Sequence, residues 1–317
     1  MQNLITLSRS TGTRAWSLAG QKTQMLADKR FAVKGSISKR FVNTRQLTDM
    51  DMFQEGLYQK WAMWPYGMHY WYFNVIDVNN SNVYSYILAR NQVGTRLNEQ
   101  WHWLEEDEYV VMAADFSARR FEITETSVAA GEGSLLADGF ELRIKENKVF
   151  LTFEENSFVF DTLLADSYQM QAMGAYGLYN LNAEGDGVYL IAQNVMKQGP
   201  LGPWNWLHFF EDGTYVKVFK VAGLNRKLLL DDEVWQLEDI QDLGESVLYQ
   251  ARREGLYFHL ELEKLYTASA EYQPRFSPQW NYHQVGVDLR SVKTNVPGFN
   301  TLQKGMGIME LATGLSL

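Results

Sequence analysis

The segment from Trp204 to Phe210 carries side chains that can both contact an apolar ligand and hydrogen-bond to it. Trp204, Trp206, His208 and Phe210 alternate with Asn, Leu and Phe, so they share one face of an expected strand. If that face lines a lumen, the indoles offer stacking surfaces and the imidazole offers a hydrogen-bond donor. The alternative is that the rings fill a small barrel, whose interior itself needs bulky side chains.

Glu310 is a carboxyl group in an otherwise apolar terminal segment, Met306 to Leu311. An unpaired buried carboxylate costs free energy, so the group is either paired with a cation or kept protonated as a functional acid with a raised pKa. We expect pairing first and keep the acid as the alternative.

An aromatic run in the first half of the chain poses the same choice between ligand contact and core packing. It spans Met68 to Asp77 and includes His69 and Trp71. Trp64 and Tyr66, just before the run, pose the same choice. Two aromatic-rich sheets, one in each half of the chain, would suit the enclosure of a large apolar ligand.

Several other chemistries have no support in the sequence. The chain has no cysteine, and its five histidines are scattered without the spacing of common metal ligands. It contains neither the G-x-S-x-G elbow of serine hydrolases nor the G-x-G-x-x-G of dinucleotide folds. We therefore expect neither a metal nor a nucleotide cofactor.

Charge and hydropathy limit the partners and the location. The net charge of −9 argues against nucleic acid, which needs clustered basic residues. No apolar run approaches the roughly 20 residues of a membrane-spanning helix, and the N-terminus lacks the apolar region of a signal peptide. We expect a cytoplasmic protein whose partner is an apolar small molecule, and the sequence leaves a homo-oligomer open.

Short strands dominate after Pro65, and they predict an all-β fold with few helices. The clearest hairpin joins residues 141–145 to 149–153, with Leu142 and Ile144 on the buried face. We expect three parts: a partly helical N-terminal segment (1–64) that packs on the first barrel, a first β-barrel (65–168) and a second β-barrel (169–317).

Five segments in sequence order carry a resemblance to a known superfamily. They are His69-Tyr70-Trp71-Tyr72-Phe73, Gly177-Leu178-Tyr179-Asn180-Leu181-Asn182, Trp204-Asn205-Trp206, Glu211-Asp212-Gly213 and Gly305-Met306-Gly307-Ile308-Met309-Glu310. In this order they resemble the lipocalin-like superfamily that includes AttH-type proteins, carotenoid hydratases of the hydroxyneurosporene synthase type and fungal decalin-forming Diels–Alderases. The resemblance covers roughly residues 65 to 312, and family members often carry His or Asp where this chain has Tyr179 or Leu181.

The resemblance implies two lipocalin-like β-barrels side by side, a ligand pocket in or between them and no dissociable cofactor. The expected function is a cyclase that catalyses an intramolecular cycloaddition of a polyene or polyketide. One alternative is a hydratase or isomerase of an isoprenoid that uses a carboxylic acid, and the other is a carrier that binds without chemistry. The expected catalytic groups are Tyr179, Asn182, His208 and Glu310, and the expected substrate contacts are Trp64, Tyr66, His69, Trp71, Trp204 and Trp206.

Overall fold

The computed structural model describes most of the chain after residue 66 and three short strands before it. The described residues are 4–6, 15–17, 40–42, 67–90, 94–104, 108–131, 133–146, 148–163, 168–172, 176–198, 204–211, 214–221, 227–230, 233–274 and 279–313. Within them the only helix is a single 3-10 turn, η2 (Phe299–Thr301), and the rest of the regular structure is antiparallel strand. The all-β fold class expected from the sequence is confirmed.

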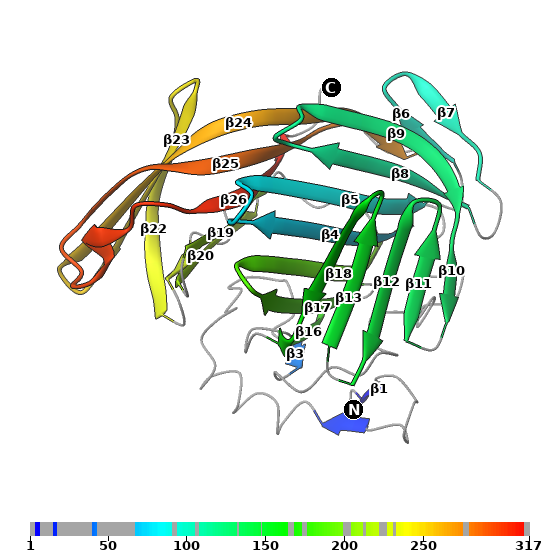
Figure 1. Ribbon diagram of the computed structural model, residues 1–317, viewed down its shortest axis with the longest axis horizontal. Coiled ribbons are helices and arrows are strands. Elements are labelled where there is room, and N and C mark those ends of the chain that lie inside the picture. The colour runs from blue at the N-terminus through cyan, green and yellow to red at the C-terminus, as the bar shows by residue number, and fades with distance from the viewer. Residues whose placement is uncertain are drawn as a thin grey trace.

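Eight strands of the second half close into an antiparallel barrel (Figure 1). They pair in the order β23-β22-β21-β20-β19-β26-β25-β24, and β23 pairs with β24 to complete the ring. The strands are β19 (Trp204–Glu211), β20 (Thr214–Val221), β21 (Lys227–Leu230), β22 (Glu233–Asp242), β23 (Ser246–Arg253), β24 (Leu256–Pro274), β25 (Trp280–Thr294) and β26 (Met306–Thr313). Closure pairs the backbone groups that an open sheet would leave unpaired along its edges.

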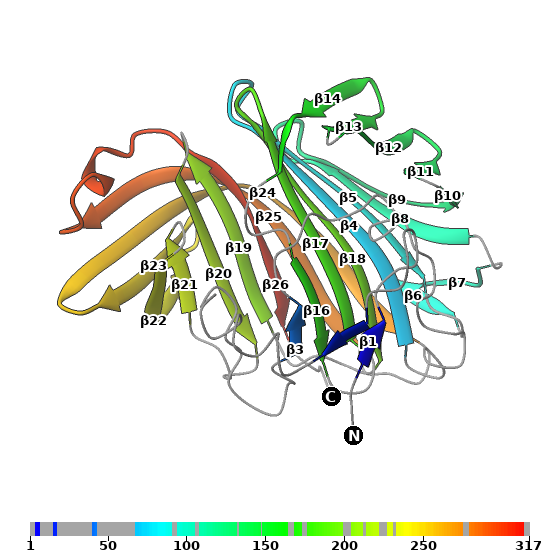
Figure 2. The ribbon, with the colours of Figure 1, turned by 90° about the horizontal axis from the view of Figure 1, so that it is seen from below.

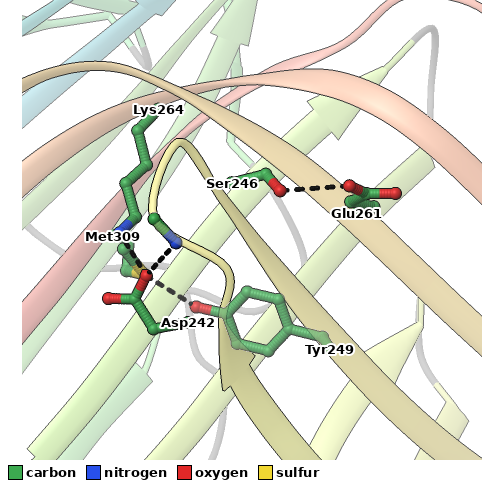
Figure 3. Close-up of polar contacts among 7 residues, drawn as sticks. Asp242, Ser246, Tyr249, Glu261, Lys264 and Met309 are labelled. Atoms are coloured by element: carbon green, nitrogen blue, oxygen red, sulfur yellow. Dashed lines mark hydrogen bonds and ion pairs between the residues drawn. The ribbon is translucent and has the colours of Figure 1, made fainter.

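Apolar side chains fill this barrel, because alternate residues of each strand point inward. Trp235, Tyr249 and Phe258 are fully buried in its core. The hydroxyl of Tyr249 lies 2.9 Å from Met309 Sδ (Figure 3). It also lies 3.2 Å from Asn205 Oδ1, so it is not left without a partner in the apolar interior. The rings of Trp235 and Phe258 therefore serve to pack the barrel core.

Polar contacts on the outer side hold one end of the barrel (Figure 3). Lys264 donates to Asp242 Oδ1 at 2.7 Å, and the hydroxyl of Ser246 donates to Glu261 Oε1 at 3.0 Å. These bonds join β22, β23 and β24, so they brace neighbouring strands where the chain turns.

A nine-stranded sheet and a five-stranded sheet face each other in the first half. The larger sheet contains β3 (Arg40–Val42), β16 (Tyr168–Ala172), β17 (Tyr176–Gly185), β18 (Val188–Gln198), β4 (Gly67–Asp77), β5 (Asn82–Arg90), β8 (Glu108–Asp115) and β9 (Arg120–Ser127) in that order, and β15 (Thr162–Leu163) pairs with β17. The smaller sheet contains β10 (Ala129–Gly131), β11 (Ser134–Ala137), β12 (Phe140–Lys145), β13 (Lys148–Phe153) and β14 (Asn156–Phe160). A separate pair joins β1 (Leu4–Thr6) to β2 (Ala15–Ser17).

The core of the first half lies between these two sheets. Trp71, Leu142 and Phe160 are fully buried there. The predicted hairpin is confirmed as β12 and β13, with Leu142 buried and Arg143 exposed on the opposite face. Its turn uses Glu146 at a φ of 53°.

The two halves exchange strands. The hairpin of β6 (Thr95–Leu97) and β7 (Gln100–His102) comes from the first half but pairs with β24 (Figure 2). Beyond the barrel, β24 and β25 continue over the nine-stranded sheet, where Ala268 and Ala270 pack against its residues. One face of the nine-stranded sheet therefore meets the five-stranded sheet, and the other meets β24, β25 and β26.

The domain boundary expected at residues 168 and 169 does not coincide with a change of sheet. Strand β16 spans that boundary, β17 and β18 follow it, and all three belong to the sheet of β4, so the chain enters the barrel only at β19. Division into independently folding units stays a prediction. The expected helical stretch in residues 1–64 lies outside the described residues. Over the described residues, no helix has the length and hydropathy required to cross a membrane.

Candidate functional site between the nine-stranded sheet and the barrel

The nine-stranded sheet and the barrel meet along a layer that is apolar at one end and polar at the other. β26 contacts both β4 and β5 across this layer. Its apolar end includes Ile76 and Ile191 from the sheet and Phe210 and Ile308 from the barrel. We call the polar end the interface cluster, and its members are Tyr72, Trp204, Trp206, His208, Tyr282, Gln284 and Glu310.

Glu310 is the only carboxyl group of the interface cluster, and it is 8% exposed. Burial raises its pKa, while hydrogen bonds from Tyr282, Tyr72, Trp204 and Gln284 act in the opposite direction without cancelling the rise. The expected pairing with a cation is wrong within the described residues, because the partner of Oε1 is the hydroxyl of Tyr282. The physical reason is that hydroxyl, indole and amide donors stabilise a buried carboxyl group without bringing in a second charge.

Two tyrosines and a glutamine surround that carboxyl group. Burial, followed by the nearby charge of Glu310, raises the pKa of both Tyr72 and Tyr282 well above the usual value, so both remain protonated donors. Gln284 is 1% exposed and donates to the hydroxyl of Ser85 at 2.8 Å, which connects β25 to β5. The alternation rule assigns Tyr72 to the face opposite Trp71, so the sequence analysis could have identified it from the aromatic run.

His208 lies two residues along the same face from Trp206, which pairs with Glu310. Its ring is 4% exposed, and burial lowers its pKa to about 3. Neither ring nitrogen has a hydrogen-bond partner among the described residues. A neutral imidazole that keeps a donor and an acceptor unused inside a protein is uncommon and marks a candidate ligand contact.

Aromatic rings form the edge of the interface cluster. Trp204, Trp206 and Tyr282 are each only partly buried, whereas Glu310 and His208 behind them are buried. The Trp206 and His208 rings lie 5.3 Å apart between centroids, and the Trp204 ring lies 6.4 Å from that of Tyr282. The expectation that Trp204, Trp206 and His208 share one face agrees with this register, but the face meets the nine-stranded sheet and not the barrel interior.

Asn182 lies on the same layer, on the sheet side. It pairs with Ile191, which pairs in turn with Asn74, so all three point toward the barrel. Asn182 and Asn74 are both fully buried. Lys217, the cross-strand neighbour of His208, is also buried at 3% exposure and was not identified from the sequence. The side chain of Tyr179 lies outside the described residues, although its backbone belongs to β17.

His69 and Trp71 point the other way, into the core of the first half. His69 Nδ1 lies 2.9 Å from the hydroxyl of Tyr109, and its Nε2 lies 2.9 Å from Asn194 Oδ1. Burial lowers the pKa of His69 to about 4, opposed by the Asn194 hydrogen bond and assisted by Arg90. The structure therefore separates these two expected contacts from Trp204 and Trp206. Trp64 and Tyr66 lie outside the described residues.

Replacing Trp71 by Ala should lower stability and have little direct effect on a ligand at the interface cluster. The ring is fully buried, with its centroid 4.3 Å from that of His69 and 5.2 Å from that of Tyr109, so its removal leaves a cavity. The expected loss is about 3–5 kcal/mol in the free energy of unfolding, measured by urea denaturation. A loss below about 1 kcal/mol would contradict a packing role and would favour the ligand contact expected from the sequence.

Metal ligands do not gather anywhere in the described part of the chain. No group of three or more His, Asp or Glu side chains there has the geometry to hold a metal ion. The interface cluster itself offers carboxyl, hydroxyl, amide and imidazole groups.

Comparisons with known proteins were made for both sequence and fold. No family model matches the sequence, and no curated protein is significantly similar to it. A solved structure of a provisionally assigned AttH protein from Nitrosomonas europaea is similar to this chain with a TM-score of 0.41 and 10% sequence identity, over 77% of this chain and 91% of that chain. At this identity the similarity concerns the fold alone.

Proposed function

We propose that the protein is an enzyme that binds an apolar, unsaturated small molecule at the interface cluster and that protonated Glu310 is its acid. The observation that carries this proposal is the burial of a carboxyl group behind partly exposed aromatic rings, and this burial raises its pKa. Carboxyl groups with raised pKa values are typical general acids near neutral pH. Aromatic rings at the edge suit a polyene, which stacks on them and excludes water.

The reaction that fits a single carboxylic acid best is isomerisation or hydration of a carbon–carbon double bond. Glu310 donates its proton to one carbon and becomes a carboxylate. In isomerisation this carboxylate removes a proton from another carbon, and in hydration it takes a proton from the water that adds. Either way the acid is regenerated and no redox cofactor is required.

Neighbouring groups have defined tasks in this scheme. Tyr282 donates to Glu310 Oε1 and so holds the carboxyl group in position for proton transfer. His208 and Glu310 are diagonal neighbours on adjacent strands, and such pairs lie about 7–8 Å apart. The neutral His208 ring is thus positioned to hydrogen-bond a polar atom of the same ligand.

Cyclisation is the second candidate, and the burial of Asn182 on the same layer favours it. A buried amide can donate to a substrate carbonyl whose negative charge grows during a cycloaddition, and the loss of one such donor costs on the order of a hundredfold in rate. In this case Asn182→Ala would lose activity while Glu310→Gln would retain it.

Glu310→Gln tests the acid directly. We expect conversion of a polyene probe such as all-trans-retinal, followed by chromatography of its isomers and hydrates, to fall on the order of a hundredfold. Wild-type activity should fall as pH rises through the raised pKa of Glu310, because the protonated form is the acid. The infrared band of a protonated carboxylic acid should disappear in the variant. Glu263→Gln, an exposed carboxylate on β24, is the matched control.

Two outcomes would reject the acid role. Glu310→Gln could keep full activity, or the infrared band could be absent from the wild-type protein at neutral pH. If retinal binds to both proteins and neither converts any polyene or polyketide probe, the carrier alternative replaces the enzyme.

A further inference from the structure

A concave site separate from the interface cluster lies where the β6–β7 hairpin meets the outer strand β9. The cavity there has a volume of about 500 Å³, within the size range of small-molecule sites. Its lining residues are Leu97, Asn98, Gln100, His102, Phe121, Ile123, Thr124 and Glu125. Figure 1 shows the hairpin beside β9 at the upper right, at the end of the sheet that bears β8 and β9.

The hairpin that forms one wall of this cavity is held in position by its turn conformation and by hydrogen bonds to β24. Asn98 and Glu99 have φ values of 45° and 71°, as a two-residue turn with both residues in the left-handed region requires. The backbone nitrogen of Asn98 donates to Glu271 O at 3.0 Å, and its side-chain oxygen accepts from the Glu271 nitrogen at 2.8 Å. These bonds fix the turn to β24, so the cavity is pre-formed.

A carboxylate and an imidazole form the polar side of the cavity. His102 is 5% exposed, and its Nδ1 is hydrogen-bonded to Glu125 Oε1. The carboxylate accepts a hydrogen bond from Nδ1–H, and in the tautomer that carries its proton on Nδ1 the other nitrogen, Nε2, is a hydrogen-bond acceptor. Among the described residues His102 makes no other hydrogen bond, so Nε2 is available to a donor on a ligand.

The remaining lining residues indicate which other chemical groups a ligand of this cavity would carry. Leu97, Phe121 and Ile123 form an apolar side. Leu97 belongs to the same buried apolar cluster as Ile87 and Met112, and Phe121 and Ile123 pack against that cluster. The described lining contains Glu125 but neither Lys nor Arg, so it disfavours an anion.

We propose that this cavity is a binding site for a neutral small molecule with an apolar ring body and a hydroxyl group. The rings lie against Leu97, Phe121 and Ile123, and the hydroxyl donates to Nε2 of His102. Glu125 acts as a positioning residue, because its hydrogen bond to Nδ1 holds the ring in the accepting tautomer. The site is distinct from the interface cluster and does not depend on the function proposed there.

Titration calorimetry with two matched probes tests this site. 2-Naphthol carries the hydroxyl, and 2-methoxynaphthalene has the same rings but no donor. We expect 2-naphthol to bind at least about tenfold more tightly, since the lost hydrogen bond leaves Nε2 buried without a partner. His102→Phe should weaken 2-naphthol binding about tenfold and remove the preference between the probes.

Variants on β9 complete the test. Ile123→Trp should abolish binding of both probes by filling the cavity. Glu125→Gln should reduce the preference for the hydroxyl. Glu122→Gln, the same change on an exposed neighbour that does not line the cavity, should leave binding unchanged. Thermal melting checks that each variant is folded. Failure of 2-naphthol to bind, equal binding of the two probes, or wild-type affinity in folded His102→Phe overturns the proposal.

Discussion

Acidification from pH 7 to pH 4 should remove about 6 kcal/mol of stability through His69 and His208 alone. Both rings are buried, and burial lowers their pKa values to about 4 and about 3. Below about pH 6.5 the unfolded chain protonates these rings while the folded protein does not, so the unfolded state binds more protons and stability falls with pH. Each ring accounts for a loss of about 3 kcal/mol in the free energy of unfolding by pH 4. The whole free energy of unfolding of a typical domain is only about 5–15 kcal/mol.

Urea denaturation at several pH values between 4 and 7 measures this loss. His208→Phe removes one titration together with two unpartnered nitrogens, so it should reduce the pH dependence without lowering stability at pH 7. His69→Gln supplies an amide that can hydrogen-bond to Tyr109 and Asn194, and it should also reduce the pH dependence of stability. Glu310 acts in the opposite direction, since its raised pKa makes the folded state gain stability as pH falls through the raised value toward the ordinary carboxyl pKa. An unchanged pH dependence in both variants would show that other groups control acid unfolding.

Gly307→Ala should prevent the barrel from closing. A Cβ at this position would lie 2.3 Å from the carbonyl oxygen of His208 and 2.9 Å from the Cα of Phe209. These are backbone atoms of the paired strand β19, so the clash cannot be relieved by rotating a side chain. We expect a loss of more than about 4 kcal/mol, which is exceptional for one methyl group, and mostly insoluble protein on expression.

Gly131→Ala is the matched control for that substitution. A Cβ there would meet only the Ser134 hydroxyl at 3.8 Å, an ordinary contact. Its stability should stay within about 0.5 kcal/mol of wild type, as for most surface changes. A folded Gly307→Ala protein with wild-type melting would mean that β19 and β26 can separate at this point, and it would contradict the close pairing that makes His208 a diagonal neighbour of Glu310.

Local patterns in the sequence predicted the strands better than they predicted the partners of those strands. The alternation of residues 141–153 was sufficient for the β12–β13 hairpin, because register and turn lie within one short segment. Likewise, alternation correctly grouped Trp204, Trp206 and His208 on one face. Which neighbour that face meets depends on contacts between distant segments, such as β18 with β4, and no local pattern encodes these.

The same limit applies to the candidate site. Glu310 was identified because a carboxyl group in an apolar strand is chemically anomalous, and that anomaly is visible in sequence. Tyr72 and Gln284 are ordinary strand residues, and they matter only because β4 and β25 approach Glu310 in space. The His102 and Glu125 pair was missed for the same reason, since each residue alone has no distinguishing neighbours.

Because the halves exchange strands, folding depends on the order in which distant strands pair. Leu97 of β6 pairs with Tyr272 of β24, and Val188 of β18 pairs with Asp77 of β4, so long loops must close before either edge is covered. Chains dominated by such distant pairings fold slowly and expose strand edges while they do so. A fragment ending near residue 168 would leave β4 without β18 and β6 without β24. Such a fragment would collect in aggregates, whereas the whole chain shields both edges by supplying its own partners.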